Sequence, residues 1–119
     1  LVNDRNVIEG LRTAAEKTIG ADHVITVQNP SLGSEDFSFL FPLLAPGAQF
    51  RLGSGNDVDP NTRHGLHNSK NIFDDSCIAA GTAVLVQYTK DFLKQQRSLL
   101  WKKRKNFRSR PHVLCYSCL

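Results

Sequence analysis

The sequence predicts an α/β fold, because helix-like and strand-like segments alternate along most of its 119 residues. Two long stretches have apolar side chains at helical spacing, and two short stretches have the composition of strands. Apolar residues make up 40% of the chain, which is ordinary for a globular domain. No apolar run approaches the roughly 20 residues that cross a bilayer. We therefore expect no membrane partner.

The first predicted helix covers residues 5–19, where apolar side chains recur at i, i+3, i+4 and i+7. Asn3 or Asp4 is expected to cap its start, since short polar side chains accept hydrogen bonds from the first backbone N–H groups. Gly20 is expected to end it. The β-branched segment 23–27 that follows predicts a strand.

The middle of the chain predicts a second helix over residues 34–44, short or kinked because Pro42 lies inside it. Residues 48–52 alternate apolar and polar side chains and predict a second strand. Residues 53–63 are rich in Gly, Asn and Asp and predict a polar loop.

A long helix is expected after the acidic pair Asp74 and Asp75, either of which, like Ser76, is a suitable cap. Its apolar positions continue to Leu93. Gly81 inside a helix costs about 1 kcal/mol relative to alanine. We expect a close approach of a neighbouring strand to account for this glycine.

The charge changes sign near Lys94. Residues 1–93 contain 7 basic and 11 acidic side chains, a net charge of −4, whereas residues 94–119 contain 8 basic and no acidic ones. A step of this size marks a boundary. We therefore divide the chain into a domain at 1–93 and a basic extension at 94–119 that we expect to be partly disordered.

The basic extension also allows another function. Trp101 and Phe107 lie among its basic residues, a composition that suits nucleic acid or an acidic surface. A solvated extension is the simpler interpretation, so a nucleic-acid partner is not our first expectation. The odd cysteine count and the lack of a signal-peptide pattern argue against a disulfide framework and favour the cytoplasm.

Several short motifs, in their order and spacing, resemble one enzyme family. They are Val2-Asn3-Asp4, Gly33-Ser34-Glu35-Asp36-Phe37, Pro46-Gly47-Ala48, Leu66-His67-Asn68 and Phe73-Asp74-Asp75. The family is that of the metal-dependent amidohydrolases, aminoacylases and carboxypeptidases, which includes hippurate hydrolase, N-acyl-amino-acid amidohydrolases and auxin-conjugate hydrolases. The resemblance covers residues 1–93 and implies the C-terminal part of a zinc-peptidase-like catalytic domain, with a central mixed sheet flanked by helices.

The resemblance also implies the chemistry. The intact enzyme is expected to hydrolyse the amide bond of N-acyl or N-aroyl amino acids, or of small peptides, with water activated by two divalent ions, zinc or manganese. His67 matches the last metal ligand, and Gly33 and Ser34 match a loop that holds the substrate. The general base, the other ligands and a lid or dimerisation domain are expected upstream of this chain. The chain alone is therefore expected to be inactive, and the intact enzyme to form a homodimer.

Two alternatives stay open. His64 forms a His-x-x-His pair with His67, but loop spacing alone does not bring two ligands onto one ion, so we interpret His64 as an exposed loop residue. The family commonly has proline where this chain has Ser69, and a different run at residues 71–73. The rival to the enzyme is a non-enzymatic remnant, or a small module that binds nucleic acid or an acidic surface through residues 94–119.

Overall fold

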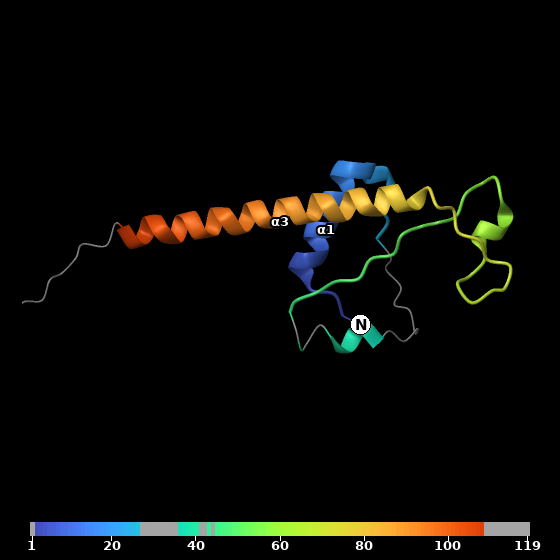
Figure 1. The fold of residues 1–119 in the computed structure, drawn as a ribbon, viewed down its shortest axis with the longest axis horizontal. Coiled ribbons are helices and arrows are strands. Elements are labelled where there is room, and N and C mark those ends of the chain that lie inside the picture. Colours follow the sequence, from blue (N-terminus) through green and yellow to red (C-terminus); the bar gives the residue numbers. More distant parts are fainter. Residues whose placement is uncertain (1, 27–35, 41–42, 44, 109–119) are drawn as a thin grey trace, which may run out of the picture.

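The computed structural model describes residues 2–26, 36–40, 43 and 45–108. The elements, in order, are helix α1 (Arg5–Ile19), the short 3-10 helices η1 (Ala21–His23), η2 (Asp36–Phe39) and η3 (Pro60–Arg63), and the long helix α3 (Cys77–Arg108). The radius of gyration is 22.1 Å, compared with about 13 to 14 Å for a compact domain of this length. The molecule is elongated because α3 is much longer than the layer of elements that packs on it (Figure 1).

Helix α1 has the predicted bounds and caps. The Asp4 carboxylate accepts hydrogen bonds from the backbone N–H groups of Asn6 and Val7, at 2.9 and 3.0 Å. Gly20 ends the helix with a φ of 88°, a conformation that favours glycine. Both ends were predictable because each depends on residues adjacent in sequence.

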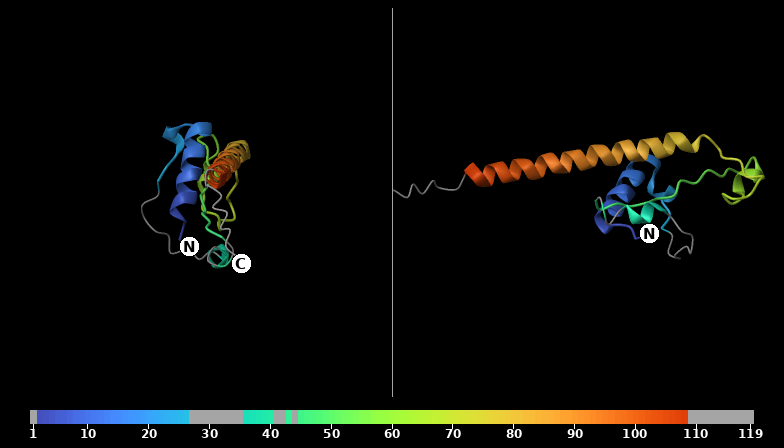
Figure 2. Two further views of the ribbon diagram at one scale, coloured as in Figure 1. Left: turned by 90° about the vertical axis from the view of Figure 1, so that its left-hand side faces the viewer. Right: turned by 60° about the horizontal axis from the view of Figure 1, so that its bottom comes forward.

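Helix α1 crosses the first half of α3 steeply, and the two helices form the main packing contact (Figures 1 and 2). The core of the described residues is small, since its buried apolar side chains are Leu11 and Ala14 of α1 and Val84 of α3. At the edge of this contact, the Lys17 ammonium lies 2.8 Å from the Asp91 carboxylate. Gln87 Nε2 donates to the other oxygen of Asp91 at 3.0 Å.

The extended segment 45–52 contacts both helices of this pair, near the start of α1 and at Gly81 of α3. Its backbone is held by Asn3, whose side-chain amide accepts from the Gln49 N–H at 2.8 Å and donates to the Gln49 carbonyl at 3.0 Å. The Asp4 N–H also donates to the Gly47 carbonyl at 2.8 Å. Further along, Leu52 packs on α3 at Gly81, where an added Cβ would stand 2.8 Å from Leu52 Cδ2. A neighbouring segment does come close at Gly81, but through the Leu52 side chain and not, as predicted, through the backbone of a strand.

The predicted α/β fold with a central mixed sheet is wrong for the part of the chain that the structure describes, which contains helices and no strand. A strand needs a neighbour to pair its backbone N–H and C=O groups. In segment 48–52 the Gln49 backbone forms hydrogen bonds with the Asn3 side chain instead of with a second strand. At 23–27 the chain first closes a 3-10 turn at His23, and residues 24–26 follow without regular structure.

The helix predicted over 34–44 is short where it is described, with η2 covering Asp36–Phe39. The long helix begins at Cys77, as expected from its acidic cap region, and continues across Lys94 as far as Arg108. Residues 94–108 of the basic extension are therefore helical, and residues 109–119 lie outside the described residues. The division of the chain at residue 93 stays a prediction. No described helix is both long and apolar enough to cross a bilayer.

Candidate functional site

The predicted metal ligand lies on the loop between Gly53 and Ser76, which extends beyond the first turn of α3, away from α1 (Figure 1). Asn56 organises this loop. Its side-chain oxygen accepts from the N–H groups of Val58 and Asp59, at 2.9 and 2.8 Å. Its side-chain nitrogen donates to the Asp74 carboxylate at 2.7 Å. One amide therefore connects the start of the loop with its end.

Thr62 forms the second half of the same network. It is the buried polar residue of the described chain, with 7% of its surface exposed. Its hydroxyl accepts from the Asn56 N–H at 3.0 Å and donates to the Asp59 carbonyl at 2.6 Å. Arg63 adds an ion pair with Asp57 on the outer surface. Because buried polar groups need partners, this network fixes the loop without an apolar core.

Asp74 joins the loop to α3. Its carboxylate accepts from Asn56 and from the Ser76 N–H, the latter at 2.9 Å, and its carbonyl accepts from the Cys77 N–H. Hydrogen bonds to the carboxylate, first from the Asn56 side chain and then from the side chain and backbone of Ser76, hold the pKa of Asp74 below its ordinary value. The charged form of Asp74 is therefore the form that ties the loop to the helix.

His67 lies in the exposed part of this loop, inside a turn that the hydrogen bond from the Asn68 N–H to the Gly65 carbonyl closes. A second turn, closed by the Asn71 N–H to the Asn68 carbonyl, follows it. His64 is also exposed and follows η3 directly. The two imidazoles thus belong to a loop whose backbone is fixed at Asn56 and Asp74 but whose tip is open to solvent.

The described residues do not by themselves form a metal site. Among them, no group of three or more His, Cys, Asp or Glu side chains lies close enough to hold an ion. Catalytic zinc usually takes three protein ligands. His67 fits such a site only as one donor of a larger set, with the other donors supplied from outside the described residues.

The predicted substrate loop, Gly33 and Ser34, lies outside the described residues. The structure therefore does not test whether this loop and His67 face one another. Asp36 and Phe37, from the same motif, begin η2 and are exposed.

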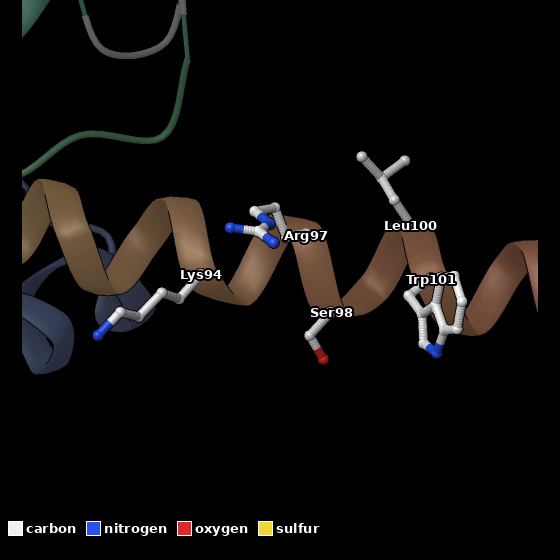
Figure 3. A pocket seen from close by; sticks show the side chains of 5 residues that line it. All are labelled: Lys94, Arg97, Ser98, Leu100 and Trp101. Carbon is white, nitrogen blue, oxygen red and sulfur yellow. The ribbon is translucent and has the colours of Figure 1, made fainter.

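A hollow elsewhere on the surface is lined by Lys94, Arg97, Ser98, Leu100 and Trp101, all from α3 (Figure 3). It lies far along the chain from the loop of His67 and borders a single helix. An open surface of this kind does not enclose a small substrate, since ligand pockets bury most of the ligand.

Comparison with known proteins identifies the family. The family model of peptidase family M20/M25/M40 matches residues 1–91, and the chain belongs to this family. The chain is also 36% identical over 83 residues to a protein of Synechocystis sp. described as a probable hydrolase. That alignment covers 70% of this chain and 21% of the relative, so the chain spans about a fifth of the relative's length. No solved structure matches the chain.

Family membership confirms the coarser part of the sequence interpretation, namely that the chain belongs to a metallopeptidase-like family of hydrolases, which is generally metal-dependent. Sequence reasoning missed the Asn56–Thr62–Asp74 network. The stretch Asn56-Asp57-Val58-Asp59 was a usable signal, because Asn and Asp side chains often bond to backbone N–H groups two residues on.

Proposed function

We propose that the intact protein is a metal-dependent amidohydrolase that cleaves the amide bond of N-acyl or N-aroyl amino acids, or of small peptides. The observation that supports this most is the family match over residues 1–91. Residues 1–93 are then the C-terminal segment of the catalytic domain, and residues 94–119 form an extension to it. The proposal keeps the cytoplasmic location expected from the sequence.

His67 is the proposed metal ligand. Its support is the resemblance at Leu66-His67-Asn68 together with its exposed place on a fixed loop. A neutral imidazole on a braced loop suits divalent ions, zinc or manganese, of which the intact enzyme is proposed to hold two. When bound, such ions lower the pKa of water and so supply a nucleophile near neutral pH. His67 would contribute by holding one ion in place.

Gly33 and Ser34 are the proposed substrate-binding residues. Glycine lets a ligand approach the backbone closely, and backbone N–H groups can receive a carboxylate. The resemblance implies the substrate class, and these groups suit it, because an N-acyl amino acid presents a free carboxylate beside its amide bond. The general base is proposed to come from the part of the enzyme upstream of these residues.

The exposed apolar side of α3 supports an origin in a larger domain. Ile78, Leu85, Phe92 and Leu93 are each 46 to 61% exposed, and monomeric proteins rarely leave such a row uncovered. We propose that the rest of the catalytic domain packs on this row. A lid domain and a homodimer belong to the same proposal.

The test compares two histidines of one loop in the intact enzyme. His67→Ala should lower kcat/KM on N-acetyl and N-benzoyl amino acids more than about a hundredfold, because losing even an outer partner of a ligand costs 10- to 100-fold. Metal analysis of the same variant should show less bound zinc or manganese per chain. The control, His64→Ala, should keep both activity and metal within about twofold of wild type.

Two results would contradict parts of the proposal separately. Full activity and full metal content in His67→Ala would remove His67 from the metal site but leave the enzyme class intact. An intact wild-type enzyme that holds metal yet cleaves neither acyl amino acids nor dipeptides would instead remove the substrate class.

A further inference from the structure

The C-terminal half of α3 lies beyond the region that matches the family. That match ends at residue 91, and the last hydrogen-bonded contact of α3 with α1 is at Asp91, whereas the helix continues to Arg108. Residues 94–108 span about 22 Å at 1.5 Å per residue. Figure 2 shows this half of the helix projecting away from the other described elements.

One side of this projecting helix is basic and includes a tryptophan. Lys94, Arg97, Ser98 and Trp101 follow the i, i+3, i+4, i+7 spacing that places residues on one helix face. We call this surface the Trp101 face. The same register continues through positions 104, 105 and 108, which are Arg, Lys and Arg in the sequence. Residues 94–119 contain no acidic side chain, although Lys94 lies one turn beyond Asp91 and interacts with its carboxylate.

The surroundings of Trp101 suit a ligand in which a flat ring lies next to an anionic group. Trp101 is 60% exposed, and it borders the hollow together with the Lys94, Arg97 and Ser98 side chains. Figure 3 shows Leu100 pointing to the opposite side of α3 from Lys94 and Ser98. Lys94, Ser98 and Trp101 therefore lie toward one side of the helix, and Arg97 lies between that side and Leu100, which also borders the hollow.

We propose that the Trp101 face binds single-stranded nucleic acid, with one base stacked on the Trp101 indole and backbone phosphates paired with Lys94 and Arg97. Single-strand binding combines a positively charged track with aromatic stacking, and stacking tolerates any base. Eight basic residues in the final 26 positions supply the charge complementarity. This site is separate from His67 and from hydrolysis.

A lipid surface fits this arrangement less well. A helix that lies on a membrane turns its apolar side inward and its charges toward the headgroups. Here Leu93 and Leu100 are seven residues apart and share a side, which is turned by about 100° from Lys94 and Trp101 because neighbouring residues of a helix differ by that angle. With Leu93 and Leu100 in the bilayer, Arg97 would be turned toward the bilayer as well, because it lies one helical turn from each leucine, and a charge there is costly.

The first experiment uses the 119-residue chain and a fluorescein-labelled 20-residue oligo(dT), with binding followed by anisotropy. Affinity should be measurable at 50 mM salt and fall steeply by 300 mM, because phosphate binding releases counterions. Trp101 is the sole tryptophan, so unlabelled oligo(dT) should quench the intrinsic fluorescence of the chain as a base stacks on the indole. A blunt duplex of the same length should quench it far less, since its bases are already stacked.

Matched variants separate the stacking from the charge. Trp101→Leu should weaken oligo(dT) binding about tenfold with an unchanged salt slope, and Trp101→Phe should restore most of the loss. The double variant Lys94→Gln/Arg97→Gln should reduce the slope of log affinity against log salt by about 1.4, at about 0.7 per phosphate contact. Lys103→Gln removes one charge from the same helix on the side opposite Lys94 and should change the affinity least. Far-UV circular dichroism checks that all variants keep the helix.

Three outcomes would overturn the proposal. The first is no binding of oligo(dT) at 50 mM salt. The second is binding that Trp101→Leu leaves unchanged, without fluorescence quenching, which would reduce the face to a non-specific polyanion surface. The third is binding to vesicles with 30% phosphatidylserine but not to oligo(dT), which would assign the helix to membranes.

Discussion

Gly10 of α1 lies so close to Tyr88 of α3 that a Cβ added to Gly10 would stand 2.8 Å from Tyr88 Cε2. Real Cβ atoms essentially never approach a neighbour this closely, so the crossing of the two helices depends on the missing side chain. Gly81 has an equally short approach, but to the Cδ2 end of Leu52, which is partly exposed. An added side chain is therefore expected to have different effects at Gly10 and at Gly81, although the distance is the same.

Gly10→Ala should destabilise the protein by about 1 kcal/mol, because overpacking against a ring costs about 1–3 kcal/mol and the helix gains only about 1 from alanine. Gly81→Ala should be neutral or slightly stabilising, since the end of the Leu52 side chain can move aside. Urea denaturation of both variants measures the difference. Equal effects of the two substitutions would show that the Tyr88 ring yields as easily as Leu52.

Asp91 should make the stability depend on pH. The hydrogen bond from Lys17, then that from Gln87, lowers its pKa below the ordinary value. A carboxylate with a lowered folded-state pKa stabilises fully above its unfolded pKa of about 3.9, and this contribution is lost as the pH falls through the folded-state pKa. Asp91→Asn should therefore have a lower Tm than wild type at pH 6, and the gap should close by about pH 2.

The matched control for that titration is Asp22→Asn, an exposed acid in η1. Its Tm should track wild type at both pH values. Lys17→Met should reproduce most of the effect of Asp91→Asn, because the two residues form one ion pair at 2.8 Å. A gap between Asp91→Asn and wild type that persists below pH 2 would mean that the pair does not set the pH dependence.

Asn56→Ala should loosen the loop of His67, because the amide bonds Val58, Asp59 and Asp74 at once. Losing several hydrogen bonds of about 1 kcal/mol each predicts a cost of about 2–3 kcal/mol in loop opening. Hydrogen exchange should show the Val58 and Asp59 amides losing protection.

The control for the loop is Asn68→Ala. The wild-type Asn68 side chain accepts one hydrogen bond, from the Lys70 N–H at 2.9 Å. It should leave the Val58 and Asp59 amides protected. Unchanged exchange in Asn56→Ala would place the support of the loop elsewhere, with Thr62 as the next candidate.

Asn3 should act as a substitute strand partner for Gln49. Asn3→Asp keeps the acceptor for the Gln49 N–H but loses the donor to the Gln49 carbonyl, whereas Asn3→Ala loses both. The free energy of unfolding should be highest for wild type, lower for Asn3→Asp and lowest for Asn3→Ala. The difference between wild type and Asn3→Ala should be about 1 kcal/mol, because the hydrogen bonds are exposed. Thermal unfolding of the three proteins measures this order. If both variants are as stable as wild type, Asn3 does not hold the Gln49 backbone in this way.

Much of the helical structure could be predicted because its causes are local. Asp4 and Gly20 bound α1 through contacts with their immediate neighbours. The acidic residues before Cys77 similarly mark the start of α3. For the candidate site, the sequence indicates His67 and the family match supports the enzyme class, but the metal role of His67 and the substrate role of Gly33 and Ser34 remain predictions.

By itself the sequence determined the helix starts, the family of residues 1–91 and the change of charge at Lys94. Only the tertiary structure decided that segment 48–52 pairs with Asn3 rather than with a strand, and that Asn56 ties to Asp74. These partners lie 46 and 18 residues apart, so no local pattern reveals them. The structure also decided that α3 continues through the basic residues, which places Lys94, Arg97 and Trp101 on one face because a helix repeats every 3.6 residues.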